Sequence, residues 1–519
     1  MKALPHLFAL LALATTAFAG EPLPAVFVTD SSSDNVWRLQ DLNADGDYND
    51  AGEIVEYYSD ALGPFTLSNN NVVELGSDGT LYVGDTSNDA IYAMVDNDSD
   101  GECNDVGETR LFFDQTNASG IDMSSIADLH AAADGRLWAS NANNGGGGFD
   151  GVFWMRDGNN DGDANDAGEA VLYYNITSAA VGDSNPTGLT IGPDGSVYFV
   201  ENGSTGVFAK GVYRLEDVDL SGTIDQPGEA AAFFLPAAQA SNPFFWDLEL
   251  GTDGAFYMAD TGNELIWQFQ DQNVNDVIDI GTEDFIWWQG TSSLIWQLQV
   301  GRGGAIFAAE SQTPDRVLRF SDDDLSATID QPGEVVAVYD ETVSPVAIGN
   351  PRGMVVDTSF YGANFCDASD GSLASCPCAP GDPDTGCDLP IPAMQGGGTT
   401  GGVKLSVVKQ LTNPQNRATL MGSGFAPFSP GGGIMIRDST IDASSPVVFG
   451  DGLRCIGMAS LTRLGAAVRV GGAVTSTFGH GTMAGNGTFH YQFWFRSTPQ
   501  SFCDPTAAFS LSNGQSLTW

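Results

Sequence analysis

The chain alternates short runs of Val, Ile, Leu, Tyr and Phe with clusters of Gly, Asp, Asn and Ser. Apolar runs of this kind, bounded by turn-forming residues, predict β-strands joined by tight turns. Four such runs are most legible at residues 186–192, 193–200, 211–215 and 230–235. We see no segment with the length and roughly 3.6-residue period of an amphipathic helix. The pattern therefore predicts an all-β fold.

The four-strand pattern recurs six times, and each copy carries an acidic loop before its last strand. The first loop reads Asp41-Leu-Asn-Ala-Asp-Gly-Asp-Tyr-Asn-Asp-Ala-Gly-Glu53, and the others begin at Asp96, Asp157, Asp217, Asp271 and Asp322. The separations of 51 to 61 residues between loops suit the blade of a β-propeller, which consists of four antiparallel strands. Six copies predict a six-bladed β-propeller over residues 20–360.

The two ends of this region each hold part of a blade. The chain opens at Val26 with the pattern of a second strand, whereas a first-strand pattern without the rest of its blade follows Asn350. We expect the two ends to complete one blade together, because this pairing removes an exposed sheet edge. The acidic loops then join the third and fourth strands of each blade, near the rim of the ring.

Oxygen-bearing side chains stand at alternate positions of each loop, which we number as slots 1 to 13 from its first Asp. Slot 1 is always Asp, slot 3 is Asn or Asp, slot 6 is Gly in four copies, and slot 13 is always Glu. A tight loop with carboxylates at a spacing of two can supply the roughly six to eight oxygens that Ca²⁺ requires. Ordinary polar turns use the same residue types, but six copies in register favour calcium. The sequence thus predicts up to six structural Ca²⁺ sites.

The candidate calcium ligands come from all six loops. In chain order they are Asp41, Asn43, Asp45, Asp47, Asn49, Glu53, Asp96, Asp98, Asp100, Glu102, Asn104, Glu108, Asp157, Asn159, Asp161, Asp163, Asn165, Glu169, Asp217, Asp219, Ser221, Asp225, Glu229, Asp271, Asn273, Asn275, Asp279, Glu283, Asp322, Asp324, Ser326, Asp330 and Glu334. Loops four and six have Ser at slot 5, and slot 6 is Asp276 in loop five and Ala327 in loop six. We expect these three loops to bind calcium more weakly than the first three.

Two resemblances follow from these motifs. The loops resemble EF-hand-type calcium loops, D-x-[DN]-x-[DN]-G, except that the closing Glu stands at slot 13 instead of slot 12 and begins a strand. The succession P-x-G-L, D-G, L-Y-V and V-Y-R resembles NHL and lactonase-type (TolB-like) six-bladed propellers over roughly residues 23–358. The second resemblance implies that a ligand site would lie where the innermost strands meet the ring axis.

Polar residues alternate with apolar ones on the predicted innermost strands. Period-two alternation puts Glu74, Asp128, His130, Asp247 and Glu249 on the face that would line the channel. These side chains are candidates to hold a metal or to act as acid and base in catalysis. The alternative is a polar, water-filled channel without a catalytic role.

One difference from lactonases bears on this choice. The inner strands of lactonases read P-N-G-L, and the resemblance assigns the Asn to a channel cation. Asn71 agrees with it, whereas the corresponding residues in other strands are Thr187, Trp246, Trp296 and Arg352. His130 also stands without a Ser or Cys nucleophile in a recognisable elbow. The sequence therefore contains no complete catalytic constellation.

The charge balance argues against two classes of partner. The 519 residues include 67 acids and 19 Lys or Arg residues, a formal net charge of −48. Nucleic acids and anionic membranes are bound by basic surfaces, so we expect neither as a partner. Many of the acids lie in the loops as candidate cation ligands, and the others give an acidic, solvated surface.

The first residues have the form of a secretory signal. Lys2 precedes an apolar run at 4–13, and Ala17-Phe-Ala19 precedes Gly20 as at a cleavage site. We expect a signal peptide at residues 1–19 and no integral membrane segment, since no later run reaches the roughly 18 apolar residues that span a bilayer. This predicts an exported protein, whether extracellular, cell-surface or periplasmic.

The cysteines divide between the two halves of the chain. Cys103 lies in the second loop, and the other six are Cys366, Cys376, Cys378, Cys387, Cys455 and Cys503. In an exported protein these six predict disulfides. Our hypothesis is two bridges within 366–387 and one between Cys455 and Cys503. A metal site at Cys376 and Cys378 is the weaker alternative.

The region beyond the propeller divides into two parts. Residues 361–402 form a Cys-rich segment with a Gly-rich linker. Residues 403–519 predict a disulfide-containing β-sandwich-like domain, which resembles a C-terminal module of exported bacterial proteins of unassigned function. The resemblance implies an adhesion, sorting or carbohydrate-binding appendage. His480 and His490 are candidate ligands there, although the sequence favours ordinary hydrogen-bonded histidines.

These observations lead to two functional hypotheses. The first is an exported calcium-binding propeller that acts as a binding, scaffold or cell-surface interaction protein, with a protein or carbohydrate as its ligand. The alternative is a metal-dependent hydrolase, lactonase-like or esterase-like, with its site in the channel. Because the catalytic constellation is incomplete, the sequence favours a non-enzymatic protein.

Overall fold

A computed structural model describes residues 23–357 with short gaps, and beyond them strands between residues 363 and 518. The gaps fall at 44, 77, 99, 133, 143–149, 177–183, 193–194, 204–208, 237–242, 252, 292, 302–303 and 323–325. In the C-terminal region, side chains are described at residues 490–492 alone. The proposed signal peptide and all six C-terminal cysteines lie outside the described residues.

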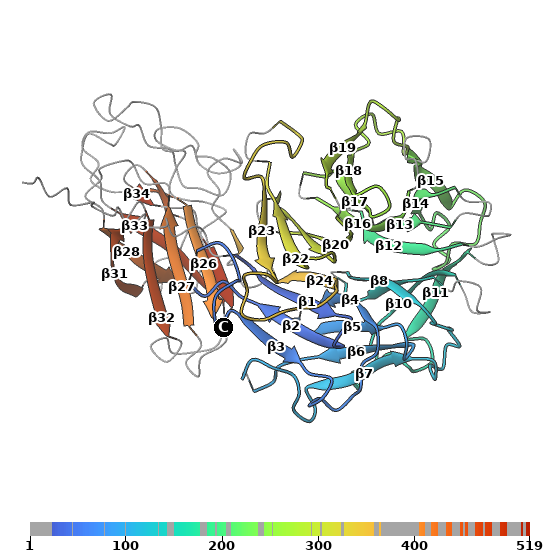
Figure 1. Ribbon diagram of the computed structural model, residues 1–519, viewed down its shortest axis with the longest axis horizontal. Helices are drawn as coiled ribbons and strands as arrows, with labels where there is room; N and C mark the ends of the chain where they lie inside the picture. Colours follow the sequence, from blue (N-terminus) through green and yellow to red (C-terminus); the bar gives the residue numbers. More distant parts are fainter. Residues whose placement is uncertain are drawn as a thin grey trace, which may run out of the picture.

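Six four-stranded antiparallel sheets surround a central axis, as Figure 1 shows, and they confirm the six-bladed propeller. The innermost strands are β24 (Pro351–Asp357), β4 (Asn70–Leu75), β8 (Ile126–Ala131), β12 (Pro186–Ile191), β16 (Phe245–Leu250) and β20 (Ile295–Val300). The second strands are β1 (Ala25–Asp30), β5 (Leu81–Asp85), β9 (Leu137–Asn141), β13 (Val197–Glu201), β17 (Phe256–Asp260) and β21 (Ile306–Glu310).

The outer half of each blade completes the sheet. The third strands are β2 (Asn35–Leu39), β6 (Ala90–Met94), β10 (Gly151–Met155), β14 (Gly211–Leu215), β18 (Leu265–Phe269) and β22 (Arg316–Phe320). The fourth strands are β3 (Ile54–Tyr58), β7 (Thr109–Asp114), β11 (Ala170–Asn175), β15 (Ala230–Phe234), β19 (Asp284–Gln289) and β23 (Val335–Asp340). Numbering the blades from the N-terminus, blade one contains β24, β1, β2 and β3.

Ring closure follows the prediction from the two ends of the repeat region. Strand β1 pairs antiparallel with β24, and the register places Val26 opposite Val356 and Val28 opposite Met354. These four side chains are buried, with exposures of at most 5%. Residues more than 320 positions apart in the chain thus form one blade, which leaves neither end of the ring with an unpaired inner edge.

The core of the propeller lies between neighbouring blades. Buried aliphatic and aromatic side chains from adjacent sheets form clusters, such as Val72 of β4 with Ile126, Leu129 and Ala139 of the next blade. Strands in the middle of the blades are buried at every position, as in β6, β9, β13 and β21, because each sheet is covered on both faces. No helix among the described residues is long and apolar enough to cross a bilayer.

The C-terminal region is also made of strands where it is described. They are β25 (Ala363–Asn364), β26 (Lys404–Gln410), β27 (Arg417–Ser423), β28 (Gly432–Asp438), β29 (Val447–Phe449), β30 (Gly452–Arg454), β31 (Thr462–Val470), β32 (Ala473–Gly479), β33 (Thr488–Phe495), β34 (Ser510–Leu511) and β35 (Gln515–Thr518). Nine of them pair in one sheet, and β29 pairs with β30. The β-sandwich, its disulfides and the role of His480 concern side chains outside the described residues, so they stay predictions.

Candidate functional site

Each acidic loop joins the third and fourth strands of its blade, as the sequence predicted. The first loop runs from Asp41, after β2, to Glu53, before β3. Its backbone coils because side-chain oxygens accept N–H groups two positions ahead: Asn43 Oδ1 from Asp45 at 2.8 Å, and Asp45 Oδ1 from Asp47 at 3.3 Å. Short polar side chains form such local turns readily.

Slot 6 makes the sharp turn in every loop. Its N–H donates to the slot 1 Asp Oδ2 in all six loops, at 2.7–3.1 Å. Its φ lies between 64° and 105° in every copy, including the two that lack Gly, Asp276 and Ala327. Gly adopts this left-handed conformation without the steric cost of a Cβ. The fifth and sixth loops therefore keep the shape of the loop at the expense of backbone strain.

The closing Glu at slot 13 is buried and hydrogen-bonds to the backbone of its own loop. Its side chain is at most 7% exposed in every copy: Glu53, Glu108, Glu169, Glu229, Glu283 and Glu334. In loops one, three, four and five, both carboxylate oxygens accept backbone N–H groups of the same loop, at 2.8–3.2 Å. Burial raises the pKa of Glu53, whereas the N–H groups of Leu42 and Asp50 lower it. In Glu229 the N–H of Gln226 is the main cause that lowers the pKa.

The second loop differs in a way that suits a cation. Glu108 Oε1 accepts N–H groups from Asn97 and Asp98, but Glu108 Oε2 is buried without a hydrogen-bond partner in the described part of the chain. A buried carboxylate oxygen without a partner is costly unless a cation or a donor reaches it. The donor set of this loop therefore fits calcium.

Three groups of acidic side chains bring their ligand atoms within 4.8 Å of one another among the described residues. They are Asp96 with Asp98 and Asp100, Asp100 with Glu102 and Asp105, and Asp217 with Asp219 and Glu229. The first and third contain candidate ligands from slots 1 and 3, and the third also contains the closing Glu. The fourth loop thus gathers three carboxylates although Ser221 occupies slot 5. Asp324 of the sixth loop lies outside the described residues.

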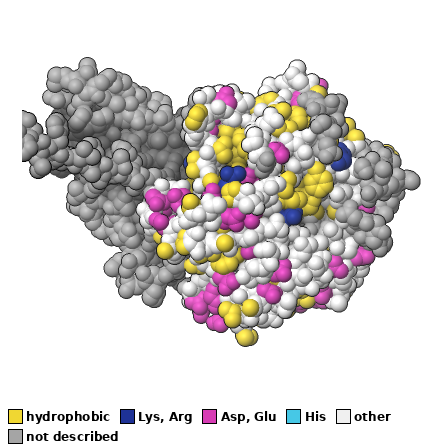
Figure 2. Space-filling model, viewed as in Figure 1, with side chains coloured by type: hydrophobic (Ala, Val, Ile, Leu, Met, Phe, Trp, Pro, Cys, Tyr) yellow, Lys and Arg dark blue, Asp and Glu magenta, His cyan; other side chains and the backbone are white. Residues whose placement is uncertain are grey.

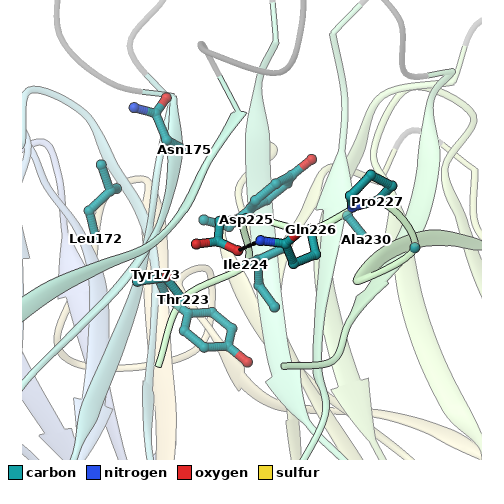
Figure 3. A pocket seen from close by; sticks show the side chains of 11 residues that line it. Leu172, Tyr173, Asn175, Thr223, Ile224, Asp225, Gln226, Pro227 and Ala230 are labelled. Carbon is teal, nitrogen blue, oxygen red and sulfur yellow. Dashed lines mark hydrogen bonds between the residues drawn. The ribbon is translucent and has the colours of Figure 1, made fainter. Parts of the chain in front are cut away.

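Each loop also touches the preceding blade. The slot 8 N–H donates to a carbonyl of that blade's fourth strand at 2.7–2.8 Å in all six copies, from Tyr48, Cys103, Ala164, Ile224, Ile278 and Ile329. These slot 8 side chains are at most 9% exposed. Figure 3 shows one such junction, where Ile224 and its neighbours lie against Tyr173 of β11 beside a cavity of about 560 Å³. The loops are therefore the places where blades are joined at the rim.

Slot 9 adds a second bond across the first three junctions. The side-chain oxygens of Asn49, Asn104 and Asn165 accept N–H groups from Asp340, Ser59 and Asp114 of the preceding blades, at 2.8–3.1 Å. The loop pattern predicts these Asn residues as cation ligands. Their oxygens bond the neighbouring blade, so their main contact here is between blades.

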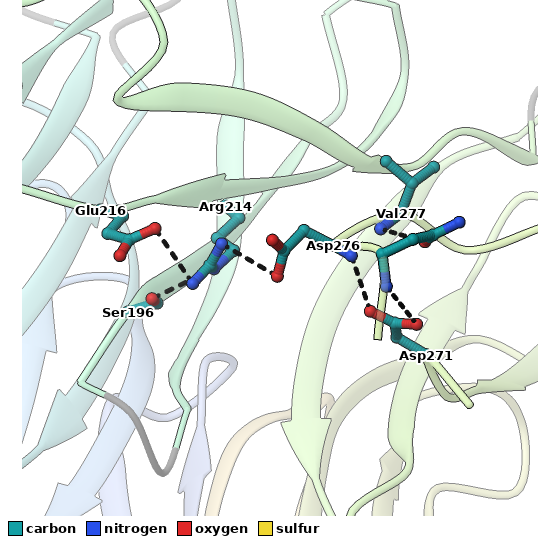
Figure 4. A network of polar contacts seen from close by, with 7 residues as sticks. Ser196, Arg214, Glu216, Asp271, Asp276 and Val277 are labelled. Atoms are coloured by element: carbon teal, nitrogen blue, oxygen red, sulfur yellow. Dashed lines mark hydrogen bonds and ion pairs between the residues drawn. The ribbon is translucent and has the colours of Figure 1, made fainter. Parts of the chain in front are cut away.

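Arginine side chains connect three blades to slot 6 of the next loop. Figure 4 shows Arg214 of β14 bridging Ser196 and Glu216 of its own blade and Asp276 of loop five, whose carboxylate is 3.2 Å from Arg214 Nη1. Arg110 Nε donates to the carbonyl of Gly162 at 2.6 Å, and a Cβ at Gly101 would lie 2.9 Å from Arg38 Nη2. Asp276, which replaces Gly at slot 6, thus forms an ion pair between blades. No pattern in the sequence predicts this contact.

The channel carboxyl groups bridge neighbouring inner strands. Glu74 Oε1 accepts the N–H of Ala131 at 2.9 Å, Asp128 Oδ2 that of Leu189 at 2.7 Å, and Asp247 Oδ2 that of Leu298 at 2.6 Å. Each bond crosses from one blade to the next, where the inner edge of the strand would otherwise leave its N–H group without a partner. Gln297 does the same toward Met354 at 2.8 Å.

Two junctions of the inner ring use glycine instead. A Cβ at Gly188 would lie 2.5 Å from the Cα of Asp247, and a Cβ at Gly353 would lie 2.8 Å from the Cα of Val72. Atoms in real structures do not approach this closely, so these positions require Gly. The backbones of adjacent inner strands make direct contact there.

Burial shifts the pKa values of the channel groups. It raises the pKa of Glu74 to about 8 and lowers that of His130 to about 4. It also raises the pKa of Asp128, Asp247 and Glu249, and the neighbouring charge of Asp247 raises those of Asp128 and Glu249 further. Asp128 and Asp247 hydrogen-bond to each other, and Glu249 Oε1 accepts from Gln299 Nε2 at 2.8 Å.

Four of the five channel candidates lie near one another, because the charge of Asp247 acts on Glu74, Asp128 and Glu249. Burial is the one cause that shifts the pKa of His130, and a common channel lining of all five stays a prediction. The five candidates do not bring three metal-ligating atoms within 4.8 Å of one another, in contrast to the second and fourth loops. The channel donor set consequently does not fit a resident divalent cation as arranged here.

Comparison with known proteins gives a likeness of fold. No family model and no curated protein matches the sequence. Among solved structures, virginiamycin B lyase from Staphylococcus aureus has 18% identity and a TM-score of 0.34, covering 55% of this chain and 76% of that one. A gluconolactonase from Xanthomonas campestris has 14% identity and a TM-score of 0.36, covering 64% of this chain and 90% of that one. A luciferin-regenerating enzyme has 13% identity and a TM-score of 0.38, covering 58% of this chain and 84% of that one.

Proposed function

We propose that this protein is an exported calcium-binding β-propeller that acts as a binding or scaffold module. In this proposal the cations are structural, and they occupy the acidic loops at the rim. The function of the cations is to hold each loop in the shape that joins it to the preceding blade. Residues 1–19, 20–360, 361–402 and 403–519 are then signal peptide, propeller, Cys-rich linker and C-terminal β domain.

The observation that carries the proposal is the slot 8 hydrogen bond, which recurs at all six blade junctions. Without a cation, the converging carboxylates of a loop repel one another and disfavour the conformation that makes this bond. A bound Ca²⁺ removes that repulsion, so calcium affinity would add directly to the stability of the ring. Further support comes from the buried Glu108 Oε2 in the second loop.

Thermal unfolding with calcium and with a chelator tests the proposal. Each site filled at a hundredfold excess over its Kd adds about 2.7 kcal/mol, so we expect calcium to raise the Tm by several degrees. Asp100→Asn should have a lower Tm than the parent protein in calcium, because it removes a ligand. In chelator its Tm should equal or exceed that of the parent, because it also removes a repulsive charge.

Glu56→Gln is the matched control. Glu56 is a partly exposed acid on β3 whose oxygen accepts a hydrogen bond from Asn35, and a carboxamide oxygen can accept the same bond. This variant changes the net charge equally but should leave the calcium-dependent rise intact. A parent protein whose Tm is the same in calcium and in chelator would disprove the structural role of calcium.

A second candidate function is hydrolysis of a lactone or ester in the channel. The observation that favours it is the Asp128–Asp247 pair. Burial raises both pKa values, the charge of Asp247 raises that of Asp128 further, and a hydrogen bond with Asp128 lowers that of Asp247. One carboxyl can therefore stay protonated while the other accepts a proton. Such a pair can act as acid and base without a metal.

A screen with lactone and ester substrates tests this candidate. If the channel is the site, Asp128→Asn and Asp247→Asn should lower kcat by about 100-fold or more, and Glu74→Gln and Glu249→Gln should alter the pH profile. Activity that is equal in all four variants would place the chemistry elsewhere, and no turnover of any substrate would count against a hydrolase.

A further inference from the structure

A row of aromatic side chains lies at the mouth of the channel, on the face opposite the acidic loops. The inner strands begin on this face, because each runs antiparallel to its second strand and the loops follow the third strands. In all six blades, the pairing of the inner strand with the second strand shifts in register near this end. Such β-bulges redirect a side chain away from the sheet. The residues at this point are Asn71, Ala127, Thr187, Trp246, Trp296 and Arg352.

Blades five, six and one bring three of these residues into contact. The rings of Trp246 and Trp296 meet edge to face with centroids 4.9 Å apart, and the guanidinium of Arg352 lies 3.6 Å from the Trp296 ring centroid. Phe244 stacks on Trp246 at 5.6 Å, and Lys210 Nζ is 6.0 Å from the Phe244 ring centroid. All five side chains are partly exposed. We call Lys210, Phe244, Trp246, Trp296 and Arg352 the mouth row.

The side chains of the mouth row are held in place by hydrogen bonds. Trp296 Nε1 donates to Ser311 Oγ at 2.6 Å, Lys210 Nζ donates to the carbonyl of Pro243 at 2.6 Å, and Arg352 Nε donates to Asn350 Oδ1 at 3.3 Å. A surface whose aromatic and cationic groups are already oriented loses little conformational entropy when it binds a ligand.

The two cations at the ends of the row differ in their surroundings. Burial lowers the pKa of Lys210 while the charges of Asp260 and Glu201 raise it, whereas Arg352 has no such acid near it among the described residues. Where the structure is described, Arg136, Arg214 and Arg316 form ion pairs, but no carboxylate lies within 4.0 Å of Lys210 or Arg352. Burial alone lowers the pKa of Arg352, with no raising contribution from an acid. In a chain of net charge −48, a stacked arginine without an ion-pair partner among the described residues is unexpected. Figure 2 shows how few Lys and Arg side chains the visible face carries compared with Asp and Glu.

We propose that the mouth row binds an oligosaccharide that contains hexuronate units, and this inference rests on the proposed binding function. The apolar C–H face of a pyranose ring packs on an indole, whose face carries a partial negative charge. Guanidinium and ammonium groups at the two ends recognise carboxylates, the guanidinium with two parallel hydrogen bonds. The row has one cation at each end and three aromatic rings between them, so a short chain of acidic sugars would meet the cations with carboxylates of its end units.

Isothermal titration with trigalacturonate tests the proposal, with galactotriose as the neutral counterpart. The parent protein in saturating calcium should bind trigalacturonate at least tenfold more tightly than galactotriose. Arg352→Gln and Lys210→Gln should each weaken trigalacturonate binding about tenfold, while Arg352→Lys should retain part of it. Trp246→Ala should weaken the binding of both sugars, because it removes a stacking surface.

Arg136→Gln is the matched control for the loss of a stacked arginine. Arg136 lies over Trp138 at 4.9 Å, as Arg352 lies over Trp296, but it is already paired with Asp134 at 2.6 Å. It should bind trigalacturonate like the parent. If Trp246→Ala does not fold, the two charge variants still decide the question.

Each contrary result has a definite meaning. Equal affinity for the two sugars would overturn the proposal that the ligand is acidic. Tighter binding of triglutamate than of trigalacturonate would overturn the proposal that the ligand is a carbohydrate. If the protein binds neither sugar but its Tm still rises with calcium, sugar binding by the mouth row is overturned and the calcium proposal stands. If the protein binds trigalacturonate but its Tm does not rise with calcium, the calcium proposal is overturned and sugar binding by the mouth row stands.

Discussion

At the residue scale, the channel carboxyl groups combine burial with hydrogen bonds between blades. Glu74 is 8% exposed and accepts the N–H of Ala131 from the next blade. Such a group satisfies a backbone donor at the inner edge of the ring, but its charged form is poorly solvated there. The same side chain therefore stabilises the fold when protonated and opposes it when ionised.

The pH dependence of stability should report this conflict. Burial raises the pKa of Glu74 to about 8 in the folded protein, compared with about 4.3 in an unfolded chain. Between these values the unfolded chain releases its proton while the folded protein retains it. The contribution of Glu74 to the free energy of unfolding consequently falls as pH rises through this window, by at most about 1.4 kcal/mol per pH unit.

Glu74→Gln should remove this slope, because the carboxamide oxygen can accept the bond from Ala131 without ionising. The measurement is chemical denaturation at several pH values between 5.5 and 7.5, in constant saturating calcium. Glu56→Gln, which alters a partly exposed acid, should keep the slope of the parent. Parallel curves for Glu74→Gln and the parent would show that Glu74 titrates normally.

At the element scale, the blade is a unit whose two ends are adapted to different contacts. At the rim, each acidic loop bonds the preceding blade through slot 8. At the axis, inner strands are joined by carboxyl side chains at some junctions and by direct backbone contact at others, such as Gly188 against Asp247. Stability of the ring therefore depends on junctions at both radii.

Gly188→Ala should destabilise the propeller strongly. Its Cβ would meet the backbone of Asp247 at 2.5 Å, so β12 and β16 would have to separate, at a cost of about 1–3 kcal/mol or more. Gly158→Ala is a suitable control, because its Cβ would meet only side-chain atoms of Glu169, at 3.4 Å or more. The check is the midpoint of denaturant unfolding; equal midpoints for the two variants would mean that the inner strands can adjust.

At the scale of the whole molecule, ring closure and charge act against each other. Strand β24 completes the blade begun by β1 to β3, which ties the two ends of the propeller together. The net charge of −48 opposes any compact state through self-repulsion. Acidic loops placed at every blade junction concentrate that repulsion where a divalent cation would relieve it, which is the physical basis of the proposed role of calcium.

Much of the architecture could be predicted because its determinants are local. Turn residues, alternation and a repeat of 51 to 61 residues specify the strands and the six loops. The half-blades at the two ends specified ring closure, which the pairing of Val28 with Met354 confirms. Period-two alternation also predicted Glu74 and Asp247 on one face of their strands, and the charge of Asp247 does act on Glu74.

Only the tertiary structure decided what these residues contact. Asn49 bonds Asp340, and Asp276 pairs with Arg214; both contacts cross between blades and depend on how the ring closes. The bulges that help bring Trp246 and Trp296 to Arg352 leave no local signal, because a β-bulge depends on the pairing of two strands. Sequence thus determined the repeating unit, whereas contacts between units arose from the geometry of the closed ring.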